Sequence, residues 1–134
     1  MDLNDIPLFK AMSEKMGWLS QRQKVLAQNV ANADTPNFRP HDLKEPSFKE
    51  LVGATSAKLR LAATQPAHLA GANGSSPFKE EVNRGGEVSP SGNAVHIEDE
   101  LLKVSGTASD YALTTNLYRQ HLSMLKTVLG RSGG

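Results

Sequence analysis

Four histidines and one run of three carboxylates are the residues of this chain whose types could do chemistry. The histidines, His41, His68, His96 and His121, are widely separated, and none has a histidine or cysteine neighbour at the spacing that metal ligands need. The 134 residues include no cysteine, which removes disulfides, thiolate nucleophiles and the commonest ligand of structural zinc. We therefore predict no metal site and no cofactor.

The carboxylate run is Glu98, Asp99 and Glu100, and two neighbouring carboxylates can act as the acid and the base of a hydrolase. The run also stands at the start of a long predicted helix, where the helix dipole stabilises negative charge. The dipole explains all three residues without a reaction, and no phosphate-binding glycine loop or HExxH motif occurs. We therefore predict that the protein has no catalytic residues and is not an enzyme.

Charge and hydropathy exclude further classes of function. The chain has 15 Lys and Arg against 14 Asp and Glu, so its formal charge of +1 gives no net field to attract nucleic acid. It lacks the run of about 18 apolar residues that a membrane-spanning helix needs. Its first residues lack the basic and then apolar pattern of a cleavable signal peptide. We expect neither nucleic acid nor a small-molecule substrate as a partner.

Two long helices, one toward each end of the chain, are predicted from the pattern of apolar residues. In the first helix, apolar residues recur three and four positions apart, beginning near Pro7, which suits a first helical turn. A cluster of helix breakers that ends at Pro36 follows, which predicts a helix over residues 7–32 with Gln23 as the polar member of its seam. The apolar seam residues are Phe9, Met12, Met16, Leu19, Leu26 and Val30.

The C-terminal helix has a longer seam, in which spacings of four and three alternate without a break. Asn93 or Ser91 is expected to cap its start and Gly130 to end it in a left-handed conformation, which predicts roughly 36 residues. The seam residues are Ile97, Leu101, Val104, Tyr111, Tyr118, Leu122, Leu125 and Leu129, with Ala108 and Thr115 between them.

Between the helices, residues 37–92 contain five of the seven prolines. This composition predicts an irregular segment with room for one short strand at residues 58–62. We therefore divide the chain into an N-terminal helix and turn (1–36), a loop-rich middle segment (37–92) and a C-terminal helix (93–134). The expected fold is mainly α, with the two helices packed as an antiparallel coiled coil.

The C-terminal helix carries a second apolar row, offset from its seam. One partner helix cannot cover both rows, and an exposed row of this size is typical of a protein interface. We predict that it contacts other subunits, the alternative being a small monomeric hairpin with a loosely packed outer face. The row consists of Leu102, Leu113, Leu117, Met124 and Val128.

Residues 26–39, LAQNVANADTPNFR, resemble the N-terminal signature of the flagellar rod, hook and hook-associated axial proteins, in which an amphipathic helix runs into N-x-A-N-x-x-T-P. The matching residues are Asn29, Ala31, Asn32, Thr35 and Pro36. Asn37 and Phe38 stand where members commonly have Gly and Tyr, a mild departure because Asn tolerates positive φ. We expect the amides and the hydroxyl to close the helix end. The short chain and its C-terminal helix are most similar to the proximal rod proteins of the flagellar basal body.

This resemblance implies a non-enzymatic subunit that polymerises through its terminal helices into the proximal rod, a tubular drive-shaft. It implies as partners other copies of the chain, other rod proteins, the basal-body membrane ring and the export-gate adaptor. It also implies export by the flagellar type III apparatus, which would explain a periplasmic rod protein without a cleavable signal peptide. Two alternatives stay open. One is a sister axial rod protein, and the other is a helical binding module, such as a secretion chaperone or secreted effector, whose chaperone form would be a folded dimer without its client.

Overall fold

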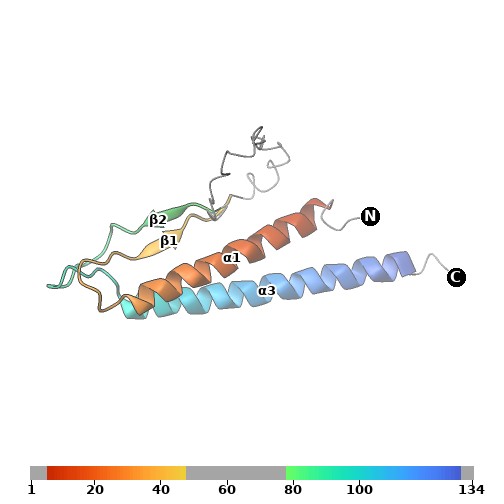
Figure 1. The fold of residues 1–134 in the computed structure, drawn as a ribbon. Coiled ribbons are helices and arrows are strands. Elements are labelled where there is room, and N and C mark those ends of the chain that lie inside the picture. Colours follow the sequence, from red (N-terminus) through yellow and green to blue (C-terminus); the bar gives the residue numbers. More distant parts are fainter. Residues whose placement is uncertain (1–5, 48–77, 131–134) are drawn as a thin grey trace, which may run out of the picture.

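The computed structural model describes residues 6–47 and 78–130 of the chain. These residues form α1 (Pro7–Ala31), β1 (His41–Leu43), β2 (Glu80–Val82) and α3 (Ile97–Gly130) (Figure 1). The strand predicted at residues 58–62 lies outside the described residues. The prediction of a mainly helical chain with two long terminal helices is confirmed.

Helix α1 begins and ends close to where its sequence signals predict. Pro7 occupies the first helical position, where its missing N–H leaves no hydrogen bond unmade. The helix stops at Ala31, and Asn32 follows as the C-cap residue, with its N–H donating to the carbonyl of Gln28 (3.0 Å). Pro36 disfavours the helical conformation in the residue before it, so the chain turns.

Helix α3 has 34 residues, close to the predicted length, but both predicted ends are wrong in detail. The helix begins at Ile97, and the N–H of Glu100 donates to the carbonyl of His96 (3.0 Å), so neither Asn93 nor Ser91 is its cap. Gly130 is its last residue and has no positive φ. The acidic first turn agrees with the dipole interpretation.

Helix α1 is the middle layer of the molecule, between α3 and the sheet (Figure 1). Near the start of α1, the Phe9 ring contacts the Tyr118 ring edge to face, with 5.1 Å between centroids. Near the end of α1, Asn29 bonds Glu100 in the first turn of α3. The two helices therefore lie side by side and run in opposite directions.

The sheet packs on the other side of α1 and completes a small hydrophobic core. Strands β1 and β2 pair antiparallel, with His41 opposite Val82. The indole N–H of Trp18 donates to the carbonyl of Lys44, just after β1 (2.9 Å). The core consists of Trp18, Leu19, Val25 and Leu43, with Phe78 packed against it.

The predicted seam is buried in α1 but only partly in α3. In α1, Phe9, Leu19 and Leu26 are buried, and Met12, Met16 and Val30 are partly buried. In α3, Val104, Tyr118, Leu122 and Leu125 are partly buried. The other four seam residues of α3 are 44% to 66% exposed, so the predicted seam is wrong there: Ile97, Leu101, Tyr111 and Leu129.

Polar residues take the place of this seam in the first half of α3. Glu100, Thr107 and Thr114 are buried there, and each comes one residue before a predicted seam position. The two threonine hydroxyls donate to the carbonyls four residues earlier, so burial leaves them with hydrogen bonds. Glu100 accepts a hydrogen bond from Asn29 of α1, which Leu101 could not do. The helix is therefore rotated so that Glu100 faces α1 and Leu101 is exposed.

Candidate functional site

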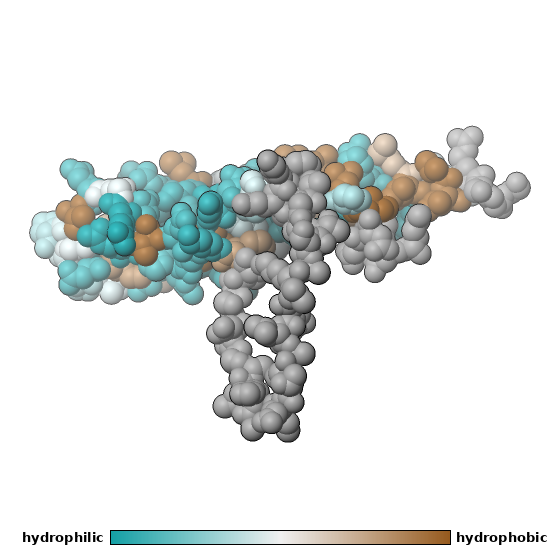
Figure 2. Space-filling view, turned by 90° about the horizontal axis from the view of Figure 1, so that it is seen from above, coloured by the Kyte–Doolittle hydropathy of each residue, from teal (hydrophilic) through white to brown (hydrophobic). Residues whose placement is uncertain are grey.

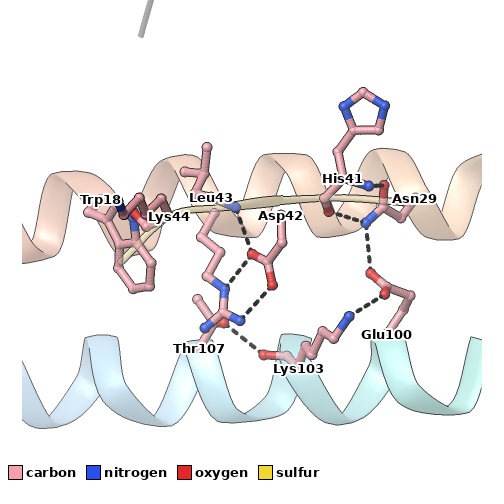
Figure 3. Close-up of polar contacts among 10 residues, drawn as sticks. Trp18, Asn29, His41, Asp42, Leu43, Lys44, Glu100, Lys103 and Thr107 are labelled. Carbon is pink, nitrogen blue, oxygen red and sulfur yellow. Dashed lines mark hydrogen bonds and ion pairs between the residues drawn. The ribbon is translucent and has the colours of Figure 1, made fainter. Parts of the chain in front are cut away.

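Asn29, the first amide of the motif, joins three elements and is 1% exposed (Figure 3). Its Oδ1 accepts the N–H of His41 (2.9 Å), and its Nδ2 donates to the carbonyl of His41 (2.6 Å). The side chain thus satisfies both backbone groups at the start of β1. Nδ2 also donates to Oε2 of Glu100 (2.8 Å), which ties the same point to α3.

Glu100 is the one member of the acidic run that is buried, at 2% exposure. Its second oxygen accepts a hydrogen bond from Nζ of Lys103 (2.8 Å). Glu98 and Asp99 are exposed on other faces of α3. The three carboxylates therefore do not converge, and they form no acid and base pair of the kind a hydrolase needs.

Asn32 and Thr35 close the end of α1. Nδ2 of Asn32 donates to the carbonyl of Gln28 (2.8 Å), and its Oδ1 accepts the hydroxyl of Thr35 (3.1 Å). The N–H of Thr35 donates back to the carbonyl of Asn32 (3.0 Å). Ala31 is the last helical residue, and Pro36 follows the turn; both are exposed.

Asn93 bridges the two helix ends, a role that the sequence reasoning missed. Its Nδ2 donates to the carbonyls of Asn32 (2.9 Å) and Thr35 (2.7 Å), and the residue is 5% exposed. Its partners are 61 and 58 residues away in the chain. No local sequence pattern predicts a contact over this distance. Asn93 precedes the start of α3 by a few residues, so the sequence favoured a helix cap instead.

Backbone contacts extend this bridge along the following turn. The N–H of Asn37 donates to the carbonyl of Ser91 (3.2 Å), and the N–H of Ala94 donates to the carbonyl of Phe38 (3.0 Å). Asn37 has a φ of 60°. Asn tolerates this left-handed conformation better than most residues other than Gly. We call the connected set Asn29, Asn32, Thr35, Asn37, Asn93 and Glu100 the junction.

Arg22 connects the middle of α1 to β1. Its Nε and a terminal nitrogen donate to the two oxygens of Asp42, each at 2.8 Å. These hydrogen bonds raise the pKa of Arg22 against the opposing effect of desolvation. Burial raises the pKa of Asp42, but the Arg22 bonds, the Leu43 N–H and nearby positive charge outweigh it and lower that pKa overall.

The histidines do not gather into a site. His41 stacks on Phe38 and bonds Glu80 (2.6 Å), and Nε2 of His96 lies 3.0 Å from the carbonyl of Glu87. His68 lies outside the described residues. Across residues 6–47 and 78–130, no three His, Asp or Glu residues are arranged to hold a metal ion. No helix in these ranges is long and apolar enough to cross a membrane.

The second apolar row of α3 is open to solvent. Hydrophobic side chains gather toward the end of the molecule where α1 begins and α3 ends (Figure 2). Four exposed apolar residues of this row form what we call the α3 ridge: Leu113 (59% exposed), Leu117 (42%), Met124 (56%) and Val128 (69%). Leu102, at 73% exposure, lies nearer the other end of the helix.

A groove of about 500 Å³ lies between α1 and the first half of α3. We call it the α1–α3 groove; Ser20, Gln23, Lys24 and Ala27 of α1 and Ala108 and Tyr111 of α3 form its walls. Oε1 of Gln23 is buried and has no hydrogen-bond donor among the described residues. A buried acceptor without a donor marks this contact as incomplete.

Comparison with known proteins identifies the family. Residues 18–39 match the family of the flagella basal body rod protein, a span that includes the second half of α1 and the motif turn. The flagellar basal body rod protein FlgB of Agrobacterium fabrum is 36% identical over 134 aligned residues, covering 94% of this chain and 96% of that protein. The chain belongs to the FlgB family of flagellar basal-body rod proteins. FlgB of Bacillus subtilis is 27% identical over 108 aligned residues, covering 81% of each chain.

Membership of the FlgB family confirms the resemblance drawn from residues 26–39. It also agrees with the prediction that the chain is not an enzyme, because the FlgB family consists of structural rod proteins. The chaperone and effector alternatives are not favoured. Three residues of the axial-protein motif, Asn29, Asn32 and Thr35, belong to the junction.

Proposed function

We propose that this chain is a structural subunit of the proximal rod of the bacterial flagellar basal body, polymerising through α1 and α3 into a tubular drive-shaft. The observation that carries the proposal is the distribution of side chains on α3. Its polar residues Glu100 and Thr107 are buried toward α1, whereas the α3 ridge is exposed. Neighbouring subunits would cover the ridge, and each Å² of apolar surface they bury contributes about 25 cal/mol.

The finer parts of the proposal rest on the resemblance and on the names of the relatives. We place α1 and α3 together as a coiled coil inside the rod wall, with other copies and other rod proteins as neighbours. The basal-body membrane ring and the export-gate adaptor would lie at the base of this rod. The subunit would reach the periplasm through the flagellar type III apparatus, without a cleavable signal peptide.

Replacing Leu117 by Asp tests the proposal. Leu117 is exposed in the subunit, so we expect Leu117→Asp to fold and to be exported normally. A charge in the middle of the ridge would prevent docking, because burying an unpaired carboxylate costs several kcal/mol. Basal bodies isolated from these cells should lack the protein and the distal rod, and the cells should not swim.

Asn116→Asp is the matched control, since it adds the same charge one residue away on an exposed position outside the ridge. These cells should assemble rods and swim. Normal swimming of Leu117→Asp cells would contradict the proposal. A stable dimer of the purified chain that captures an unfolded export client, with no incorporation into basal bodies, would instead support the chaperone alternative.

A further inference from the structure

The α3 ridge and the α1–α3 groove lie on opposite flanks of the helix pair. Successive residues of an α-helix are about 100° apart. Lys24 and Ala27 therefore face away from the side of α1 that carries Trp18 and the sheet. Asp110 of α3 lies on the flank that carries the sheet. The pKa of Arg22, which bonds Asp42 of the sheet, is raised first by those hydrogen bonds and further by the nearby negative charge of Asp110. Leu117 follows Asp110 by two helical turns and shares its flank.

Each surface is unfilled in the subunit and suited to a helix. Small side chains at Ala27 and Ala108 leave the groove open between the two helices. The buried Oε1 of Gln23 lacks a donor among the described residues. The ridge offers four exposed apolar side chains on one helix, which would fit against the open space beside Ala27 and Ala108.

Each surface also has a charged residue of opposite sign. Lys24 forms part of the groove wall, and Asp110 lies one turn before Leu113 at the ridge. Neither is in an ion pair in the described part of the chain, where the ion pairs are Arg22 with Asp42, His41 with Glu80, Lys79 with Glu81, and Lys103 with Glu100. Both residues are exposed.

We propose that the α3 ridge of one copy docks into the α1–α3 groove of a second copy, with Asp110 of the first facing Lys24 of the second. The contact joins two different surfaces on opposite flanks, so each added copy presents a new ridge or a new groove. Such a heterologous contact repeats into a ring or a helical tube, whereas a two-fold dimer would use the same surface twice. The inference rests on the proposed rod function and specifies which surfaces of adjacent copies meet.

Charge reversal tests the pairing in cells that carry the full-length variants. Lys24→Glu and Asp110→Lys should each lower the number of complete basal bodies by about tenfold, because like charges then meet in the contact. The double variant should return to within about twofold of the unchanged protein, since the pair is restored in reversed order. Helical circular dichroism of the purified variants checks that neither exposed substitution unfolds the subunit.

Treating isolated basal bodies with a carbodiimide gives an independent measurement. This reagent joins an amine to a carboxylate only in direct contact, so it should yield an amide between Lys24 and Asp110, two residues that face opposite flanks within one subunit. Normal assembly of both single variants, or a double variant as defective as the worse single one, would overturn the docking. If Leu117→Asp still blocked assembly in that case, the rod function would stand and only this docking would be wrong.

Discussion

A single buried amide holds three segments together at the junction. Asn29→Ala would leave the partly buried N–H of His41 without its acceptor and the buried carboxylate of Glu100 with Lys103 alone. We expect the free energy of unfolding to fall by about 2–4 kcal/mol. Urea unfolding of the purified chain measures this. Asn32→Ala, at the partly exposed C-terminal end of α1, is the control and should cost about 1 kcal/mol through its lost side-chain hydrogen bonds. Equal losses would contradict the bridging role of Asn29.

Asp42 makes stability depend on pH. Its folded pKa is lowered from the ordinary 3.8, so its contribution is complete above that pH and is lost as pH falls through the folded pKa. Asp42→Asn lacks this contribution at every pH. The stability difference between the unchanged protein and Asp42→Asn should therefore be large at pH 7 and shrink below about pH 4. A stability difference that stays constant in urea unfolding between about pH 7 and pH 3 would contradict this role of Asp42.

At the scale of elements, local signals in the sequence predict the helices well. Pro7 and Pro36 bracket α1, and an unbroken apolar rhythm marks α3, because both features act within a few residues. The rotation of α3 about its own axis could not be predicted from local signals. It depends on Glu100 meeting Asn29, a partner 71 residues away, and apolar periodicity favoured Leu101 instead. Pairing of β1 with β2 is missed for the same reason, since three-residue strands carry little periodicity of their own.

Replacing Gly by Ala should change stability in opposite directions at Gly106, inside α3, and at Gly92, in the loop before it. Gly106 lies inside α3 with open space around it. Gly106→Ala should therefore stabilise the subunit by about 0.5–1 kcal/mol. Gly92 has a positive φ, and a Cβ there would overlap the side chain of Asn37. Gly92→Ala should therefore destabilise the subunit by about 1–3 kcal/mol. Thermal unfolding compares the two. Gly86→Ala is the control, because Gly86 has no positive φ and its added Cβ would meet only ordinary contacts with His96 and Ala94, at 3.9 and 4.0 Å.

At the scale of the whole molecule, we expect folding and assembly to use different faces. The side of α1 toward the sheet and toward α3 holds the compact core, whereas the outer flank of α3 carries the exposed apolar residues. A subunit built in this way could fold alone and bury further apolar surface against neighbours. The sequence indicated the two faces of α3, but only the structure shows that its inner face buries polar side chains at Glu100, Thr107 and Thr114.

Two leucine truncations test this separation, the first in the core and the second on the ridge. Leu26 is fully buried, whereas Leu113 is exposed. Leu26→Ala removes buried methyl groups and should lower the free energy of unfolding by about 2–5 kcal/mol. Leu113→Ala should change the stability of the purified subunit by no more than about 0.5 kcal/mol.

Leu113→Ala, which should hardly change stability, should have a clear effect on assembly of the rod. Leu113→Ala should reduce incorporation into basal bodies although its subunit folds normally, because the exposed side chain it removes would be covered only by neighbours. Comparing urea unfolding with the amount of protein in isolated basal bodies gives both numbers for each variant. If Leu113→Ala lost stability as Leu26→Ala does, or if it were incorporated as well as the unchanged protein, the division of the molecule into a folding face and an assembly face would be wrong.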